Sequence, residues 1–247
     1  MIRRCLGAAA GAVLGLALAA CDRAGAPAAV ALPASAVPAS AVAAVSPTLI
    51  DGVDLSNWQG QVDFAQLKGA GVDYVFIKAS QGATVADADY PRNIQAARAA
   101  GLAAGSYHFY VTGDTPQAQF ANFSSQVQLQ PGDLPPVIDI ESLNGGSSAE
   151  LVAALKQYIG LVEQRYGVRP IIYAGESFAN GYLAGLSAYP LWLADYTSAS
   201  TPKMPSDWSG WTFWQYSQTG RVAGVDGAVD LDRFHGDLDK FRALQVR

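Results

Sequence analysis

Two carboxyl side chains in segment 135–141 give the first indication of chemistry in this sequence. The segment reads Pro-Pro-Val-Ile-Asp-Ile-Glu, and a β-branched run after two prolines predicts a loop that leads into a buried strand. Because side chains alternate along a strand, Asp139 and Glu141 should project from the same face, with Cα atoms roughly 6.6 Å apart. Two neighbouring acids repel each other, which raises one pKa and keeps that carboxyl protonated near neutral pH.

A protonated carboxyl beside an ionised one is the arrangement that glycosidic bond cleavage requires. An Asp-x-Glu string is also common at solvated strand ends, where two acids have no further role. The pair alone therefore leaves both interpretations open, and the elements around it must decide between them.

Strand-like runs recur along the chain after residue 48, with helical patterns between most of them. The expected strands are 50–55, 74–79, 103–110, 137–141, 170–174, 191–196, 212–216 and 229–234. The expected helices are 63–70, 90–100, 116–129 and 148–166. Ser147 and Glu150 form a capping-box pattern at the start of the last helix, and Gly167 is a natural stop at its end.

Eight strands with intervening helices predict a parallel α/β barrel. Two late connections depart from the regular pattern. Residues 177–186 can supply only a short helix, and the Gly-rich stretch 217–228 is too short for an ordinary crossover helix. We therefore predict an irregular TIM-like (β/α) barrel with shortened or missing late helices.

Further acids fall at the ends of the predicted strands, where a barrel places its catalytic groups. Asp54 ends the first strand, Asp195 ends the sixth and Asp230 lies in the eighth. Acids that converge from distant parts of the chain would raise one another's pKa values, as a general acid requires. Any one of them could instead cap a loop or hold a neighbouring arginine.

Aromatic residues share these strand ends, and rings along a polar cleft suit the apolar faces of sugars. They are Trp58, Tyr107, Phe109, Tyr173, Trp192, Tyr196, Trp214 and Tyr216. We expect Tyr107 and Tyr173 to face a ligand, and Phe109 and Trp214 to fill the barrel.

The first 47 residues read as export and tethering sequence rather than as part of the fold. Residues 1–21 have two arginines, an apolar run and the ending Leu-Ala-Ala-Cys, which is typical of a secretory signal peptide and resembles a bacterial lipobox with lipidation at Cys21. Residues 22–47 are rich in Ala and Pro and predict a flexible tether, which leaves 48–247 for the barrel domain. We expect an exported lipoprotein in the cell envelope, on the periplasmic side, with Asp22 weakly favouring the inner membrane.

The charge and the scarcity of histidine and cysteine exclude several other classes of protein. Loss of Arg3 and Arg4 with the leader changes the formal charge from −5 to −7, which argues against nucleic acid as a partner. With His108 and His235 as the sole histidines and no cysteine in the domain, we expect no metal site. No G-x-S-x-G or phosphate loop occurs, so we expect neither a serine hydrolase nor a cofactor, and His108 should be a packed residue.

Taken together, the motifs of this chain resemble those of glycoside hydrolase family 25, the Chalaropsis-type lysozymes. The resemblance covers residues 49–234 in the family's order, through GVDLSNWQG, FIKASQG, GSYHFY, PPVIDIE, IIYAG, LWLADY, FWQYS and VDLDRF. It implies an irregular barrel that cleaves the β-1,4 bond between N-acetylmuramic acid and N-acetylglucosamine in peptidoglycan. The lipoprotein leader and the lack of a recognisable wall-binding repeat depart from the family's pattern.

The resemblance also implies roles for particular residues. Glu141 matches the proton donor, Asp139 lies beside it, and Asp54 and Asp230 match the other active-site acids. Asp195 is less secure, because that strand end varies in the family. With the aromatic positions, this gives the expected substrate-binding residues Tyr107, Tyr173, Trp192, Asp195, Tyr196 and Gln215.

Two mechanisms and two other functions stay open from the sequence. Asp139 could orient the substrate's own 2-acetamido group for attack on the anomeric carbon, or Asp54 or Asp230 could activate a water across the cleft and invert the configuration. We favour acetamido assistance. The alternative functions are a lipoprotein that binds peptidoglycan without cutting it, and a barrel glycosidase that acts on chitin-like polymers.

Overall fold

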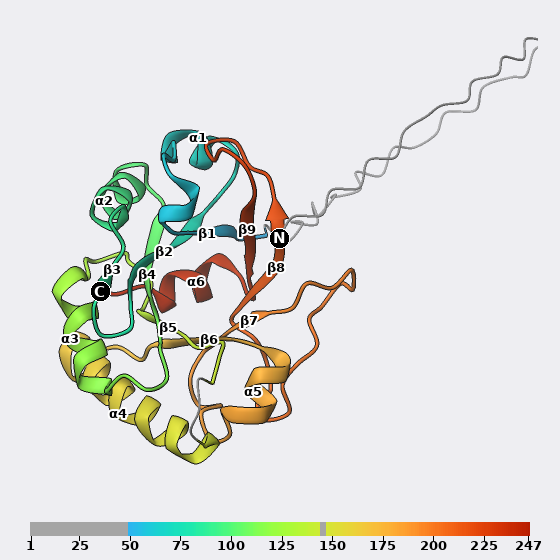
Figure 1. The fold of residues 1–247 in the computed structure, drawn as a ribbon. Helices are drawn as coiled ribbons and strands as arrows, with labels where there is room; N and C mark the ends of the chain where they lie inside the picture. Colours follow the sequence, from blue (N-terminus) through green and yellow to red (C-terminus); the bar gives the residue numbers. More distant parts are fainter. Residues whose placement is uncertain (1–48, 144–146) are drawn as a thin grey trace, which may run out of the picture. The chain divides into compact units, whose positions relative to one another are not determined.

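A closed eight-stranded barrel organises residues 49–143 and 147–247, the part of the chain that the computed structural model describes (Figure 1). The predicted signal peptide with Cys21 and the whole predicted tether, residues 22–47, lie outside these residues. The barrel strands follow one another in the order β1-β2-β4-β5-β6-β7-β8-β9, and β9 pairs back with β1. The prediction of an irregular (β/α) barrel is confirmed.

The strands agree closely with the predicted ones, with one short addition, β3, which pairs with the end of β2. They are β1 Asp51–Leu55, β2 Tyr74–Gln81, β3 Val85–Ala86, β4 Ala103–Phe109, β5 Val137–Asp139, β6 Ile171–Gly175, β7 Leu191–Ala194, β8 Phe213–Gly220 and β9 Val229–Phe234. The helices are a 3-10 turn η1 Asn57–Gln59, then α1 Phe64–Gly69, α2 Tyr90–Ala99, α3 Pro116–Gln126, α4 Ser148–Tyr166, α5 Glu176–Tyr182 and α6 Leu238–Leu244.

One strand runs against the others, which corrects the expectation of a fully parallel barrel. The neighbours from β1 and β2 round to β7 and β8 are parallel, whereas β9 is antiparallel to both β8 and β1. The Gly-rich connection before Val229 explains the reversal, because a stretch too short for a crossover helix can still return as a hairpin.

The longest helix, α4, begins and ends as its sequence predicts. The Ser147 hydroxyl accepts a hydrogen bond from the backbone N–H of Glu150, and the Glu150 carboxylate accepts one from the backbone N–H of Ser147. Gly167 takes the left-handed conformation at its end, with φ 69°. Five apolar side chains face the barrel along one stripe: Leu151, Leu155, Tyr158, Ile159 and Val162. No helix in the described ranges is long and apolar enough to cross a membrane.

Aromatic rings fill the interior of the barrel. Along β2, Tyr74 and Phe76 point inward, while Val75 and Ile77 belong to the outer layer beneath the helices. The ring of Phe76 stacks on Trp192 with centroids 4.4 Å apart. A Cβ at Gly52 or Gly105 would fall on the ring of Tyr74 or Phe76 respectively. These glycines therefore leave the space that the rings occupy.

Helix α6, which the sequence analysis did not predict, closes one end of the barrel. Its Phe241 lies 5.6 Å from the ring of Tyr74 and 5.1 Å from that of Phe234, measured between centroids. Ile50, just before β1, belongs to the same buried cluster. This closed base lies at the amino ends of the parallel strands, so the open end of the barrel is where those strands finish.

Candidate active site

A cavity of about 330 Å³ lies at the open end of the barrel. Every barrel strand, or the residues directly after it, contributes at least one side chain to the lining. The reversed strand β9 contributes from its start, because its amino end lies where the parallel strands finish. The predicted site residues in the lining are Asp54, Tyr107, Asp139, Glu141, Tyr173, Trp192, Tyr196, Gln215 and Asp230.

Asp139 and Glu141 both face the cavity, as the alternation of side chains along a strand predicted. Asp139 is the last residue of β5, and Glu141 follows two residues later, just beyond the strand. Ile140 between them is fully buried in the outer apolar layer, so the two acids point the other way. Asp139 is buried, whereas Glu141 is exposed at the mouth.

Burial shapes the electrostatics of this pair. It raises the pKa of Asp139 well above the usual range, and the charge of Glu141 and a hydrogen bond between the two carboxyls raise it further. Lys78, whose own pKa is lowered by burial, acts in the opposite direction on Asp139. The Oδ1 atom of Asp139 is buried and has no hydrogen-bond partner within the described residues. Asp139 is therefore the carboxyl of this pair that burial drives towards its neutral form.

A second pair of acids lies on the antiparallel strands. Asp54 of β1 stands directly opposite Asp230 of β9 in the register, an arrangement that is unfavourable when both carboxyls are charged. Burial raises the pKa of Asp54 well above the usual range, and the charge of Asp230 adds to this. Burial also raises the pKa of Asp230.

Gln215 of β8 holds Asp54 in place. Its side-chain amide donates a hydrogen bond of 2.6 Å to Asp54 Oδ2. Its carbonyl oxygen accepts hydrogen bonds from the hydroxyls of Tyr173, at 2.8 Å, and Tyr196, at 2.6 Å. These donors fix the orientation of the amide, so both tyrosines position Gln215 while their rings line the cavity.

Two residues, Phe109 and Asp195, lie in different surroundings from those the sequence analysis expected. Phe109 does not simply fill the barrel, because it is half-buried, lines the cavity and carries the Lys78 ammonium 4.9 Å from its ring centroid. Asp195 lies outside the lining, and its carboxylate accepts a hydrogen bond of 2.7 Å from the backbone N–H of Lys203. Strand β7 ends one residue earlier, at Ala194, so Asp195 fixes a loop instead of facing the cavity. Trp214 is buried, as expected.

The sequence analysis assigned no role in the site to four residues that line the cavity: Ser56, Gln59, Lys78 and Gln218. Trp58, one of the aromatic candidates, also lines it. The sequence does contain an indication for Lys78, because it is the one charged residue in an otherwise largely apolar strand. Trp58 is 87% exposed, yet its backbone is held firmly on η1. Ser56 and Gln59 form a capping box there, and the N–H of Asn57 donates to Asp87 at 2.9 Å.

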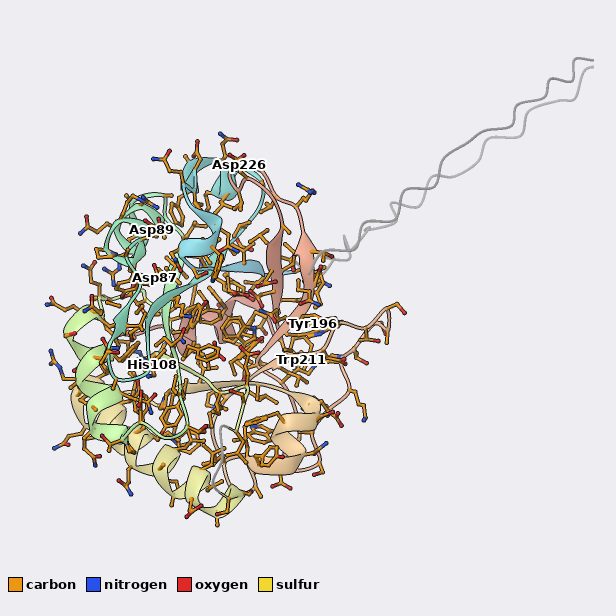
Figure 2. All side chains as sticks on the ribbon, in the orientation of Figure 1. Asp87, Asp89, His108, Tyr196, Trp211 and Asp226 are labelled. Atoms are coloured by element: carbon orange, nitrogen blue, oxygen red, sulfur yellow. The ribbon has the colours of Figure 1, made fainter. Side chains whose placement is uncertain are left out.

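His108, labelled in Figure 2, is a packed residue, as predicted. It is fully buried, and burial lowers its pKa to about 4. Gln119 Oε1 already accepts from the N–H of Val111, so it also accepts from His108 Nε2–H at 3.2 Å. The Ser80 hydroxyl then donates to His108 Nδ1 at 2.8 Å.

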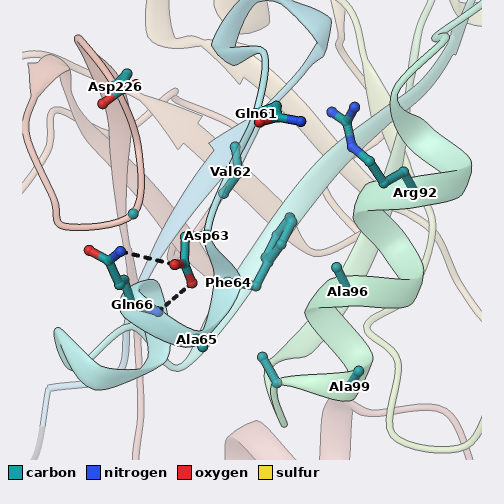
Figure 3. Close-up of a pocket in the computed structure, with 12 residues that line it drawn as sticks. Gln61, Val62, Asp63, Phe64, Ala65, Gln66, Arg92, Ala96, Ala99 and Asp226 are labelled. Atoms are coloured by element: carbon teal, nitrogen blue, oxygen red, sulfur yellow. Dashed lines mark hydrogen bonds between the residues drawn. The ribbon is translucent and has the colours of Figure 1, made fainter.

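A larger hollow of about 790 Å³ lies outside the barrel, between α1, α2 and the turn at Gly224 (Figure 3). Two of its charged side chains, Asp63 and Arg92, have partners. Asp63 caps α1 by accepting from Gln66, and Arg92 donates to the carbonyl of Gly60 and pairs with Asp89. The hollow lacks a pair of adjacent carboxyls, so it is not the candidate active site. Within the described ranges, no cluster of His, Cys, Asp and Glu is arranged to hold a metal ion.

Carboxyls gathered at the open end of a barrel, with one buried acid beside an exposed one and aromatic rings around them, define the class of barrel glycoside hydrolases. Residues 53–225 match the family described as glycosyl hydrolases family 25. The chain belongs to this family.

Individual relatives agree with this assignment. The chain is 34% identical over 209 residues to lysozyme M1 of Streptomyces globisporus, covering 79% of this chain and 71% of that protein. It is 28% identical over 212 residues to the N,O-diacetylmuramidase of Chalaropsis sp, covering 79% and 98%. The crystal structure of a bacterial lysozyme from Streptomyces coelicolor superposes with a TM-score of 0.75 at 32% identity, covering 79% of this chain and 96% of that one.

Proposed function

We propose that this protein is a peptidoglycan hydrolase of the lysozyme type, which cleaves the β-1,4 bond between N-acetylmuramic acid and N-acetylglucosamine. The family and its lysozyme and muramidase relatives support the reaction. The observation that carries the proposal is the buried Asp139 beside the exposed Glu141 in a cavity lined by aromatic rings.

In this proposal Glu141 protonates the bridging oxygen as the glycosidic bond breaks. Glu141 lies at the mouth of the cavity, where it can reach a glycan, directly beside the buried Asp139. A general acid in this position needs a proton that is available near neutral pH.

Asp139 then orients the substrate's 2-acetamido group, whose carbonyl oxygen attacks the anomeric carbon. The free Oδ1 of Asp139 supports this role, because a buried acceptor without a donor matches the N–H of an acetamido group. Lys78 favours the ionised form of Asp139, which this step requires. In the competing route, Asp54 or Asp230 activates a water and the product is inverted.

Loss of turbidity of purified cell walls tests the proposed activity. The native protein should clear the suspension and release muropeptides with N-acetylmuramic acid at the reducing end, identified by mass spectrometry. Glu141→Gln keeps the shape of the side chain and removes the proton, so it should fold normally and clear the walls at least about 1,000-fold more slowly. Equal clearing by both proteins would refute the role of Glu141.

Two further measurements separate the open alternatives. The anomer of the first product, followed by NMR, should be the retained one, and an inverted product would exclude acetamido assistance. A peptidoglycan-binding lipoprotein would sediment with walls without releasing muropeptides. A glycosidase for chitin-like polymers would cleave N-acetylglucosamine oligomers faster than wall glycan.

We also propose that the protein is an exported lipoprotein anchored through Cys21, on the periplasmic side of the cell envelope. The support is the leader that ends in Leu-Ala-Ala-Cys, followed by the Ala- and Pro-rich residues up to 47. The native protein should incorporate labelled palmitate and sediment with membranes, and Cys21→Ser should do neither. Labelling of the Cys21→Ser variant would contradict the assignment.

A further inference from the structure

Asp232 is a buried acid that the mechanism above leaves without a role. It follows Asp230 by two residues on β9, so the two side chains point to the same side of the strand. Its side chain has no exposure to solvent. The Oδ1 atom accepts a hydrogen bond of 2.8 Å from the indole N–H of Trp192, and Oδ2 has no hydrogen-bond partner within the described residues.

Among the described residues, no cation pairs with the carboxyl of Asp232. The adjacent Arg233 points to the other side of β9 and pairs with Asp51 at 2.8 Å. A buried carboxylate without a cation and with a single donor is costly, so the side chain is expected to be neutral. The raised pKa of Asp232, caused first by burial and then by the charge of Asp54, agrees with this.

The groups that face Asp232 come from every element packed against it. Across β8 its register partner is Gln215. On β1 its partner is Gly52, and Asp54 lies two residues further along the same face. Tyr74 of β2, whose hydroxyl also lacks a partner, and Asp230 complete the titratable surroundings.

Asp54 and Asp232 are diagonal neighbours on one face of the β1–β9 pair, and Gln215, the register partner of Asp232, donates to Asp54. A hydrogen bond between the two carboxyls also contributes to the raised pKa of Asp232. Two carboxyls can share a hydrogen bond only when one of them carries the proton. Each carboxyl accepts one hydrogen bond from a neutral donor, Asp54 from Gln215 and Asp232 from Trp192. Asp232 has no exposure to solvent whereas Asp54 lines the cavity, so the proton is assigned to Asp232 and Asp54 is the acceptor. We propose that Asp232 is a positioning residue that carries a proton and donates it in a hydrogen bond to Asp54, so that Asp54 meets the sugar as an oriented carboxylate with two donors behind it.

This inference rests on the proposed function in one respect, namely that Asp54 takes part in hydrolysis. Burial and Asp230 push Asp54 towards its neutral form, and the two donors oppose them. Without the donor from Asp232, Asp54 would be protonated at higher pH. The acidic limb of the kcat/KM profile should then move upward in pH.

The test compares Asp232→Asn with Asp232→Leu. The asparagine can donate to Asp54 through its amide and accept from Trp192 through its oxygen, so activity should stay within about 3-fold and the pH profile should not move. The leucine has a similar volume and no donor, so kcat/KM at neutral pH should fall roughly 10- to 100-fold, as expected for a lost hydrogen bond to a charged group, with the acidic limb at higher pH. Equal losses in both variants, or an unchanged pH profile for Asp232→Leu, would overturn the proposal.

A second measurement does not depend on activity or on folding of the leucine variant. In protein labelled with ¹³C at aspartate carboxyls, the signal that disappears in Asp232→Asn should have the chemical shift of a protonated acid from pH 5 to pH 8. An ionised Asp232 in this range would overturn the proposal even if the enzyme is active. Conversely, if Asp232 is protonated but the protein does not cleave peptidoglycan, the proposed function is wrong while the assignment of the proton to Asp232 stands.

Discussion

The barrel consists of two arcs that are built differently and deliver acids to the same cavity. The parallel arc runs from β2 to β7, and every strand in it has parallel neighbours on the barrel. The reversed arc consists of β8, β9 and β1, where β9 is antiparallel to both neighbours. The parallel arc places Asp139 and Glu141 on one chain segment, and the reversed arc places Asp54 opposite Asp230 on two strands.

The two acid pairs have different surroundings. Glu141 stands exposed at the mouth and shares a hydrogen bond with the buried Asp139. Asp54 is buried, is held by the Gln215 amide and lies within reach of Asp232. Environment sets the role of chemically similar carboxyls. The comparison teaches that the parallel arc suits a proton that moves to a leaving group, and the reversed arc suits a charge that stays in place.

The largest expected effect is a difference in kcat between variants of the two arcs. We expect Glu141→Gln to lower kcat about 1,000-fold, since it removes the general acid, and Asp54→Asn about 100-fold, since it removes only charge stabilisation. The measurement is the initial rate of reducing-end release from defined glycan, with circular dichroism as a folding control. A larger loss in Asp54→Asn would exchange the roles assigned to the two arcs.

Lys78 offers a sharper test within the parallel arc. We expect Lys78→Met to lower kcat/KM about 10-fold at mildly acidic pH and to move the acidic limb upward, because Lys78 is the charge that favours ionised Asp139. Lys78→Arg keeps the charge and is the matched control. The pH profile of kcat/KM is the measurement, and an unmoved limb in Lys78→Met would show that this ammonium does not act on Asp139.

Trp58 tests whether the rim of the reversed arc binds glycan. The exposed indole lines the cavity on a firmly held turn. Trp58→Ala should raise KM about 5- to 10-fold and leave kcat within about 2-fold, since stacking on a sugar face contributes about 0.5–1.5 kcal/mol beyond the buried area. Trp58→Phe should recover part of the loss. A change confined to kcat would place Trp58 in the chemistry rather than in binding.

The smallest effect concerns stability. Because the folded-state pKa of Asp54 is raised, its contribution is fully present below the unfolded pKa and is lost as pH rises through the folded value. Asparagine does not ionise, so Asp54→Asn avoids the cost of a buried charge at high pH. Its Tm should exceed that of the native protein by about 2–4 °C at pH 8, and by less at pH 5. The pKa of His108 is lowered to about 4, so its contribution to the free energy of unfolding is present above about pH 6.5 and is lost as the pH falls from there. Both proteins contain His108, so its effect on Tm should be the same in each. Calorimetry at both pH values checks the difference, and an equal shift at both would contradict it.

The sequence predicted the parallel arc better than the reversed arc, for physical reasons. Local alternation is enough to place Asp139 and Glu141 on one face, and the capping box of α4 is also local. The direction of β9 depends on how a short glycine-rich turn closes, which alternation does not encode. Asp232 could be assigned to the same face as Asp230, but its full burial follows from the register with Gly52 and Gln215.

Differences from the expectation at single residues have the same origin. Asp195 was expected in the cavity because its strand was drawn two residues too long, and one residue past a strand end the side chain can turn to the loop. Phe109 was assigned to the interior because its neighbours are apolar, although its half-exposed ring lies next to Lys78. Helix α6 was missed because seven residues carry too little periodicity, yet its Phe241 closes the base through tertiary packing.

The path of the chain into the barrel is set by which end of the barrel is closed. Ile50 belongs to the buried cluster at the closed base, and β1 then rises to Asp54 at the cavity. The described chain therefore enters the domain on the side of the barrel opposite the candidate active site, and its first strand leads from the closed base to the cavity.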